Sequence, residues 1–228
     1  MEICDGVYVL KLEFEMGNET HVFHPVLVKR NNGLVLIDTG LEQTVEQLRT
    51  AVEATGNDVK DIDLVVLTHQ DIDHVGGAQY VREQSGALIL APRNEVDIIS
   101  GKAAPRFGEK EAYPAVEVDI EACEGMRFAT TVGPAEILDT PGHTAGHQSV
   151  YIGRCNLLIA ADALVVENGV LMGPSPHVSV DLHRAADSLS RLGEHKIEWV
   201  SCYHGGVVST NDAEIARIAA DTRELAGR

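Results

Sequence analysis

Apolar residues cluster in short runs along the chain, and most of these runs lack the alternation of a half-exposed strand. The clearest examples are LVLID, LVVL, LILA and LLIAAD. Uninterrupted runs of this length predict strands that are covered on both faces. Near the start, GVYVLKLEFE and THVFHPVLVKR predict two antiparallel strands around the turn MGNE. Further strands are predicted at RFATTVG, AEILDTPG, QSVYIG and, last in the chain, IEWVSCYHGG.

Helical spacing of apolar residues appears between these runs. The segment LEQTVEQLRTAVEATG predicts a helix that stops at Gly56, and VGGAQYVREQSG predicts a shorter one that closes at Gly86. Two later helices are predicted over SVDLHRAADSLSRLGEH and NDAEIARIAADTRELAGR, the second capped by Asn211 or Thr210.

The order of these elements predicts a layered α/β fold. Two sheets packed together, with helices outside them, would cover both faces of the apolar strands. We find no linker long enough to separate domains, so residues 1–228 are expected to form a single domain.

Composition and charge limit the classes of molecule that the protein is expected to bind. Of 228 residues, 44% are hydrophobic, which is enough for a sizeable core, and the formal net charge is −17. A surface this acidic repels phosphate backbones and anionic membranes, so we expect neither nucleic acid nor membrane as a partner. We see no signal peptide, and no apolar stretch reaches the roughly 18–20 residues that cross a bilayer. A cytoplasmic protein acting on a small molecule is expected, and its oligomeric state is not indicated.

The cysteines are scattered without a CxxC pair, which argues against a thiolate zinc site. In a cytosolic protein such thiols are expected to be reduced and mostly buried. This prediction covers Cys4, Cys123, Cys155 and Cys202, the last of which is expected to lie buried in a strand.

The stretch THQDIDHVGGA concentrates ligand-type side chains directly after the apolar run LVVL. In an extended segment alternate side chains share a face, so His69, Asp71 and Asp73 can point to one side. His74 follows where the chain turns into a helix. Imidazole and carboxylate together suit zinc, iron or manganese. The alternative is that Asp73 caps the helix and the histidines are merely solvated.

Three further strand ends carry polar residues of the same kinds. His143 lies on a Pro-Gly turn between two predicted strands, Asp162 ends the apolar run LLIAAD, and His204 precedes Gly-Gly after the last strand. A lone histidine at a strand end is usually structural or solvated. Four polar elements at four separate strand ends favour a shared metal site.

Together these motifs resemble the metallo-β-lactamase-fold hydrolase superfamily over nearly the whole chain. They follow the family's order: LIDTG, HQDIDH, PGHTAGH, AAD and YHGG. The resemblance implies a four-layer αββα sandwich of two mixed β-sheets flanked by helices, with a two-metal site in a cleft at the sheet edges.

The resemblance also implies which residues hold two divalent metal ions. The first ion would be bound by His69, Asp71, His143 and Asp162. The second ion would be bound by Asp73, His74, Asp162 and His204, with Asp162 bridging. By the same resemblance Asp38 supports the site without binding metal, and His147 is expected to be a supporting imidazole.

Asp71 departs from the family's HxHxDH signature, because it stands at the place of the second histidine. The site is then richer in oxygen, and harder ligands shift the preference from zinc toward iron or manganese, although availability favours zinc. Flavin-partnered di-iron proteins of the same fold also carry an acid at this place. This chain shows no flavodoxin domain.

The expected reaction is hydrolysis of a small ester, lactone, thioester or amide. Two divalent ions can share a bridging hydroxide whose pKa falls to about 7, and Asp73 is placed to shuttle a proton to the leaving group. A di-iron redox enzyme acting on oxygen, nitric oxide or a sulfur species is the alternative, and a non-catalytic metal-stabilised sensor is a third. The acidic charge argues against a nuclease. The lack of a recognisable export signal argues against a secreted lactamase, unless the sequence is that of a mature chain.

Residues 101–114 and 165–180 are the expected substrate loops. The first is rich in Gly, Pro and charge, and an ordinary surface loop is an equal alternative. The second contains His177, which stands where relatives place residues that contact substrate.

Overall fold

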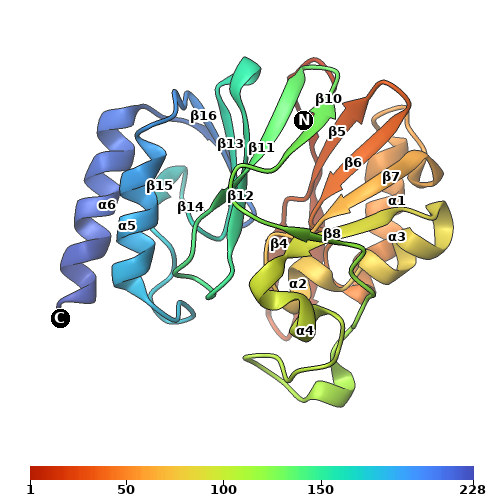
Figure 1. Ribbon diagram of the computed structural model, residues 1–228, viewed down its shortest axis with the longest axis horizontal. Helices are drawn as coiled ribbons and strands as arrows, with labels where there is room; N and C mark the ends of the chain where they lie inside the picture. Colours follow the sequence, from red (N-terminus) through yellow and green to blue (C-terminus); the bar gives the residue numbers. More distant parts are fainter. The chain divides into compact units, whose positions relative to one another are not determined.

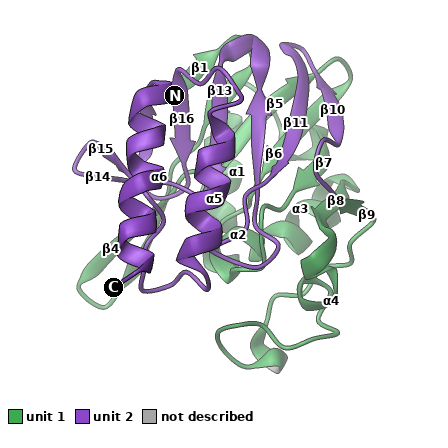
Figure 2. Cartoon of the chain, turned by 60° about the vertical axis from the view of Figure 1, so that its left-hand side comes forward, with its two compact units in different colours: residues 1–122 green, residues 123–228 purple. Residues whose placement is uncertain are grey.

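The apolar runs of the sequence form the central strands of two mixed sheets. A computed structural model describes the backbone of residues 1–228 and every side chain except that of Glu111. The chain divides into two compact units, residues 1–122 and residues 123–228, shown in different colours in Figure 2. Figure 1 gives the labels of the elements.

Unit 1 is built on a seven-stranded sheet with the order β1-β2-β5-β6-β7-β8-β9. Its strands are β1 (Glu2–Cys4), β2 (Val7–Val9), β5 (Val26–Arg30), β6 (Gly33–Ile37), β7 (Ile62–Val66), β8 (Leu88–Pro92) and β9 (Ile120–Ala122). The pairs from β1 to β6 are antiparallel, and those from β6 to β9 are parallel. Val35 and Leu36 are consecutive in β6 and both are fully buried, so this strand is covered on both faces, as the sequence predicts.

Helices connect the parallel strands of unit 1. Helix α1 (Val45–Glu53) joins β6 to β7, and α3 (Ala78–Ser85) joins β7 to β8, with the short helices α2 (Ile72–Val75) and α4 (Val96–Ile99) beside them in sequence. Figure 1 shows α1 and α3 along one face of this sheet. Gly86 ends α3 in the left-handed conformation, at φ +73°, so the predicted stop at Gly86 is confirmed.

The predicted antiparallel pairing around the turn MGNE is confirmed, but the prediction of one strand on each side is wrong, because each apolar stretch divides in two. Between them β3 (Leu12–Met16) and β4 (Glu19–Phe23) form a separate antiparallel hairpin, while β2 and β5 pair in the main sheet. The second stretch breaks at Pro25, which has no N–H to donate to a strand ladder.

Unit 2 contains a six-stranded sheet with the order β10-β11-β12-β13-β16-β17. Its strands are β10 (Arg127–Thr130), β11 (Gly133–Asp139), β12 (Gln148–Ile152), β13 (Leu157–Ala161), β16 (Trp199–Cys202) and β17 (Gly206–Ser209). The β13–β16 pair is parallel and the other pairs are antiparallel. A hairpin of β14 (Val165–Glu167) and β15 (Val170–Met172) lies apart from this sheet. The prediction that one strand ends the β-structure is wrong, since the chain turns back after Cys202 and pairs as β17.

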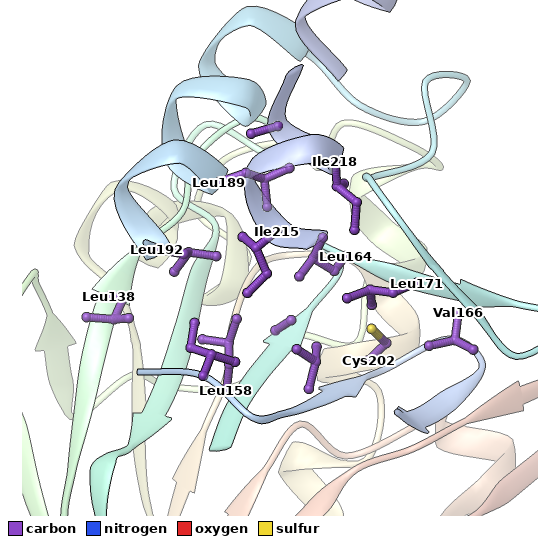
Figure 3. Packing of buried hydrophobic residues seen from close by; sticks show 14 residues of the cluster. Leu138, Leu158, Leu164, Val166, Leu171, Leu189, Leu192, Cys202, Ile215 and Ile218 are labelled. Carbon is purple, nitrogen blue, oxygen red and sulfur yellow. The ribbon is translucent and has the colours of Figure 1, made fainter. Parts of the chain in front are cut away.

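Helices α5 (Leu182–Leu192) and α6 (Asp212–Ala226) cover one face of the unit 2 sheet (Figure 1). Their apolar faces meet the sheet in a core that includes Leu158, Leu189 and Ile215, drawn in Figure 3. The Asn211 side chain accepts a hydrogen bond from the Glu214 N–H at 3.1 Å, which confirms Asn211 as the cap of α6. Burial of this apolar surface against the sheet is the main stabilising contribution of both helices.

The prediction that all four cysteines are reduced is wrong. Cys4 and Cys155 each take part in a disulfide, whereas Cys123 and Cys202 are free thiols. Disulfides persist in oxidising compartments, so the cysteines give no support to the expected cytoplasmic location. Among the residues described, the helices are all too short or too polar to cross a membrane.

Candidate metal centre

The HQDIDH segment begins where β7 ends. The Leu67 N–H still donates to the Leu90 carbonyl at 2.8 Å, and the chain then turns at Asp71 into α2. The extended conformation therefore stops at Asp71 and does not continue to Asp73 as predicted. The alternative in which Asp73 caps the helix is also wrong, because Asp71 occupies the cap position and Asp73 lies in the first turn.

Asp38 holds this segment in place from the end of the neighbouring strand β6. Its Oδ1 accepts the Thr68 N–H at 2.9 Å, and its Oδ2 accepts the Thr68 hydroxyl at 2.8 Å. The same Oδ2 lies 2.8 Å from Nδ1 of His74. A proton on Nδ1 donated to this carboxylate leaves Nε2 of His74 as the nitrogen that can bind a metal. These hydrogen bonds fit the supporting role predicted for Asp38, which stays a prediction.

Each histidine of the segment lies beside a carboxylate. The Asp71 Oδ2 is 3.5 Å from Nε2 of His69, and the Asp73 Oδ2 is 3.8 Å from Nε2 of His74. The two imidazole rings have centroids 4.0 Å apart, and both histidines are fully buried. Buried imidazole nitrogens with carboxylate oxygens beside them are a donor set that fits a divalent metal.

The glycine pair after the segment allows the backbones to approach closely. A Cβ on Gly76 would lie 2.6 Å from the Glu42 backbone nitrogen, nearer than real Cβ atoms come. A side chain here would push the segment away from the loop that follows β6. The glycine therefore keeps the Asp38 carboxylate within reach of His74.

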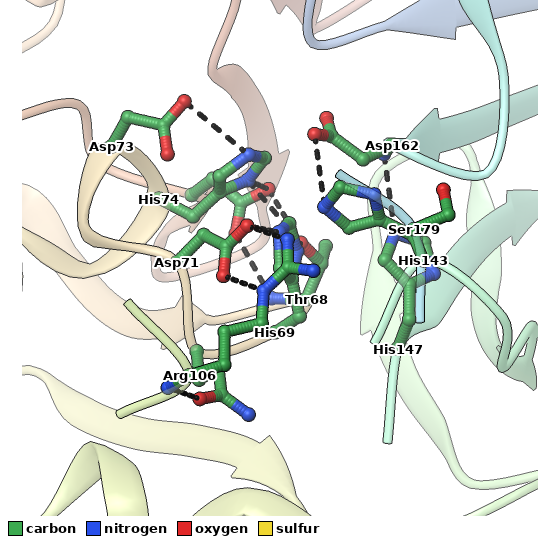
Figure 4. Close-up of polar contacts among 12 residues, drawn as sticks. Thr68, His69, Asp71, Asp73, His74, Arg106, His143, His147, Asp162 and Ser179 are labelled. Atoms are coloured by element: carbon green, nitrogen blue, oxygen red, sulfur yellow. Dashed lines mark hydrogen bonds and ion pairs between the residues drawn. The ribbon is translucent and has the colours of Figure 1, made fainter. Parts of the chain in front are cut away.

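Asp71 also binds a residue that the sequence did not single out. The Arg106 Nε–H donates to Oδ1 of Asp71 at 2.7 Å, and a second guanidinium nitrogen donates to Oδ2, as Figure 4 shows. Both side chains are largely buried. The Asp71 carboxylate and the Arg106 guanidinium thus form an ion pair that is joined by two hydrogen bonds.

In unit 2 three ligand-type residues meet at one edge of the sheet. His143 follows β11, Asp162 follows β13, and His204 lies just after β16. These three strands run in the same direction, because β11 and β13 are each antiparallel to β12 and β13 is parallel to β16. Their carboxyl ends therefore share an edge, which is where sheet proteins of this type place their sites.

One oxygen of Asp162 lies between the two imidazoles. Its Oδ2 is 3.4 Å from Nε2 of His143 and 3.5 Å from Nε2 of His204. All three side chains line a cavity of about 200 Å³, whose other walls include Val165 and Val178. A carboxylate oxygen beside two imidazole nitrogens is a donor set that fits a divalent metal.

His147 supports this arrangement from behind, as predicted. Its Nε2 accepts the backbone N–H of Asp162 at 3.1 Å, so the proton of the neutral ring lies on Nδ1. Nδ1 is 2.9 Å from the Thr140 hydroxyl, which is 2.8 Å from the Ser149 hydroxyl. The Ser149 hydroxyl in turn donates to the Ala160 carbonyl at 3.2 Å. This buried chain fixes the backbone on which the Asp162 carboxylate is carried.

Unusual backbone angles accompany both sets of ligands. Asp38 has φ +58° and Ala161, directly before Asp162, has φ +47°, a region that residues other than glycine seldom adopt. Ala161 also lies at a bulge in the β13–β16 pairing. Such strain is found where a structure holds functional side chains in place.

Cys202 is the last residue of β16, and its side chain is fully buried. Burial raises the pKa of its thiol well above the usual value, and the Asp162 charge raises it further. The thiol is therefore protonated at neutral pH, and the prediction of a buried strand cysteine is confirmed.

The structure gives His177 no place among these residues. Its side chain is exposed in the segment between β15 and α5, and it does not line the cavity that His143, Asp162 and His204 share. Sequence reasoning missed Arg106, Thr68 and Thr140. A lone arginine in a loop, or a threonine near a strand end, has no spacing that would have singled it out.

Comparison with known proteins identifies the family. A sequence model described as the Metallo-beta-lactamase superfamily matches residues 24–204. The chain is 26% identical over 207 residues to "Probable metallo-hydrolase YybB" of Bacillus subtilis (strain 168), covering 90% of this chain and 91% of that protein. It is also 31% identical over 100 residues to a hydroxyacylglutathione hydrolase of Rhizobium meliloti (strain 1021), covering 44% of this chain and 33% of that protein.

Solved structures share the fold. A metallo-β-lactamase with a HARLDQ motif from Cronobacter sakazakii superposes with a TM-score of 0.75 at 22% identity, covering 99% of this chain and 91% of that chain. A metallo-β-lactamase from Pontibacter korlensis gives a TM-score of 0.77 at 19% identity, covering 100% of this chain and 98% of that chain. These likenesses confirm the predicted fold class. The chain belongs to the metallo-β-lactamase superfamily, whose members similar to it include metallo-hydrolases.

Proposed function

We propose that this protein is a hydrolase that depends on two divalent metal ions. The observation that carries the proposal is the position of Asp162, whose Oδ2 lies 3.4 Å and 3.5 Å from the Nε2 atoms of two different histidines. A structural site needs only one ion and no shared ligand, whereas a shared carboxylate is typical of a catalytic pair.

We propose six metal ligands, which stand in the motifs on which the resemblance to this superfamily rests. Support comes from the family model, which spans the motifs of both units from residue 24 to residue 204. The proposed ligands are His69, Asp73, His74, His143, Asp162 and His204. Asp71 is not among these ligands, because both of its oxygens accept hydrogen bonds from Arg106.

The remaining chemistry is assigned to the chain's own side chains. When bound, the ions would supply a hydroxide at neutral pH and polarise the substrate carbonyl. Asp73 is the proposed proton shuttle, because its side chain is 23% exposed and lines a cavity, whereas the Asp38 side chain is 2% exposed. Asp38 would orient the His74 imidazole, and His147 would hold the backbone of Asp162 in place.

The proposed substrates are small esters, lactones, thioesters or amides. The similarity to metallo-hydrolases and to a protein named hydroxyacylglutathione hydrolase supports hydrolysis as the type of reaction. Zinc, iron and manganese all fit imidazole and carboxylate donors. The di-iron redox alternative was motivated by Asp71 as an extra oxygen ligand, and the Arg106 ion pair does not favour that reading.

Elemental analysis and a substrate panel test the proposal. The purified protein, loaded separately with zinc, iron or manganese, is expected to bind two ions per chain and to hydrolyse at least one ester, lactone, thioester or β-lactam. His143→Ala should lower the metal content and abolish turnover, while His177→Ala, an exposed histidine outside the cavity, should change neither. A single bound ion with no hydrolysis of any substrate would contradict the proposal.

A further inference from the structure

A second cavity lies beside the HQDIDH segment, entirely within unit 1. Its volume is about 330 Å³, at the lower end of the range for small-molecule sites. One wall is formed by the motif itself, from Gln70 to Asp73, and the other by the loop of residues 105–113. A part of the substrate held here would lie directly against the proposed proton shuttle Asp73.

The loop is fastened to the motif through the two residues that follow His69. The Arg106 backbone N–H donates to Oε1 of Gln70 at 3.0 Å, and the Tyr113 hydroxyl donates to the Gln70 carbonyl at 2.6 Å. Gln70 is itself held by Glu95, whose Oε2 accepts the Gln70 N–H at 2.6 Å. Both ends of the loop segment are therefore tied to one point of the motif.

The Asp71–Arg106 ion pair is the strongest of these attachments. Two parallel hydrogen bonds join the guanidinium to the carboxylate, in a setting where both side chains are largely buried. The Phe107 ring lies against the guanidinium, with its centroid 4.6 Å from the central carbon. Figure 4 shows Arg106 reaching the Asp71 carboxylate. The ion pair thus sets the position of the aromatic side chain that follows it.

The same ion pair argues against Asp71 as a metal ligand. A guanidinium stays charged at every pH a protein tolerates, so it neutralises the carboxylate and places a fixed positive charge beside it. A metal ion bound to the same oxygens would be repelled by that charge at close range. His69 lies next to Asp71 and keeps its own orientation through Nδ1, which is 3.0 Å from the Thr68 hydroxyl.

The walls of this cavity are mainly apolar. Ile72, Pro105, Phe107 and Ala112 line it, and the Phe107 and Ile72 side chains are 58% and 49% exposed. Large apolar side chains that stay in contact with water beside a reaction site are ready to be covered by an apolar ligand. Of the charged residues that line the cavity, Asp71 and Arg106 are paired with each other, and the others are the proposed proton shuttle Asp73 and Glu109.

We propose that Asp71 is a positioning residue, which holds Arg106 so that the loop of residues 105–113 forms an apolar subsite for the acyl chain of the substrate. This inference rests on the proposed hydrolase function and narrows its substrate class to acyl compounds with an uncharged apolar chain. It replaces the expectation that Asp71 binds a metal ion.

Metal content and hydrogen exchange test the positioning role without any substrate. Asp71→Asn and Arg106→Gln are expected to keep the wild-type metal content and to raise amide hydrogen exchange in residues 105–113 to a similar extent. The matched control is Arg82→Gln, which removes another two-point pair of unit 1, the one with Asp119, where Nη1–Oδ2 is 2.7 Å and Nη2–Oδ1 is 3.1 Å. Arg82→Gln should leave exchange in residues 105–113 unchanged. Loss of one ion per chain in Asp71→Asn but not in Arg106→Gln would overturn the proposal.

Chain-length preference tests the subsite. With 4-nitrophenyl octanoate and 4-nitrophenyl acetate, Phe107→Ala should lower the octanoate-to-acetate ratio of kcat/KM about tenfold, the effect of removing a few apolar contacts. Asp71→Asn and Arg106→Gln should lower the same ratio, which a general loss of stability would not do. Leu225→Ala, which removes an exposed leucine of α6, should leave the ratio unchanged. An unchanged ratio in Phe107→Ala would overturn the subsite.

A binding measurement distinguishes failure of the hydrolase proposal from failure of the proposed subsite. If the wild-type protein hydrolyses neither ester, the affinity for octanoate and acetate ions can be measured by calorimetry on the metal-loaded protein. Octanoate is expected to bind more tightly than acetate, and Phe107→Ala should remove the difference. Equal affinities in the wild-type protein would overturn the subsite, while the metal content and hydrogen exchange still decide the role of Asp71.

Discussion

The two units position their ligand-type residues in opposite ways. In unit 1 the residues are contiguous, from His69 to His74, and a carboxylate, Asp38, orients an imidazole through Nδ1. In unit 2 they come from three separate strand ends, and an imidazole, His147, holds the backbone of a carboxylate residue, Asp162. Contiguous residues come together when one local turn of the chain forms. Residues from separate strands come together only when the strand order of the whole sheet is correct.

The units also differ in how their helices begin. In unit 2 the side chains of Asp181 and Asn211 accept backbone hydrogen bonds at the starts of α5 and α6. Within the described residues, α1 and α3 of unit 1 begin without a side-chain cap. Helices α1 and α3 instead lie in the connections between parallel strands of the sheet.

The largest expected effect is that of removing the shared carboxylate of unit 2, compared with removing a carboxylate of unit 1 that is not shared. Asp162→Asn should remove most of both bound ions and lower kcat by on the order of 10³-fold, because several kcal/mol of transition-state stabilisation depend on the ions. Asp73→Asn should lower the metal content by about one ion, since Asp73 is the proposed ligand of one ion and does not bridge the pair. Elemental analysis and steady-state kinetics measure both. Equal losses of metal in the two variants would break the comparison.

A smaller effect compares the two supporting residues. Asp38→Asn should weaken metal binding about 10–100-fold, because it disturbs a carboxylate that contacts an imidazole ligand directly. His147→Gln should weaken metal binding less, since His147 acts on the Asp162 backbone and not on its carboxylate. Competition with a chelator gives both dissociation constants. A larger loss of metal affinity in His147→Gln than in Asp38→Asn would contradict this account of the two supporting residues.

The smallest effect concerns the helix caps. Asn211→Ala should lower the free energy of unfolding by about 1 kcal/mol, because the Glu214 N–H loses its acceptor at the start of α6. Thr44→Ala, at the start of α1, should cost less through capping, since its hydroxyl donates to the Leu41 carbonyl at 2.9 Å and does not accept from the helix. Denaturant titration of both variants measures the difference. A larger loss in Thr44→Ala would contradict the contrast between the units.

The sequence predicted the parts of the fold that follow from local patterns. The apolar runs of β6, β7, β8 and β13 were recognised because strands buried on both faces carry consecutive apolar residues. Strand β17 was missed because Gly206–Ser209 is short and follows a glycine turn that reads as a terminus. The break at Pro25 was missed because the apolar pattern continues across it.

The sequence predicted the ligand-type residues and not their partners. His69, His143, Asp162 and His204 stand in recognisable motifs, and the structure brings the last three together within unit 2. Asp71 was predicted as a ligand from its place in the motif, while its ion pair with Arg106 crosses 35 positions of the chain. A contact between residues so far apart depends on the path of the loop, which no local pattern records.

The left-handed backbone at Asp38 and Ala161 bears on how this scaffold can diversify. Asp38 directly follows β6, and Ala161 is the last residue of β13 and lies at a bulge, so both strands end at a residue in this conformation. Insertions or deletions further along the connecting segments would therefore leave the anchoring residues in register with the sheet. A change of loop length alone would then change the shape of the cavity in either unit and leave these residues in place.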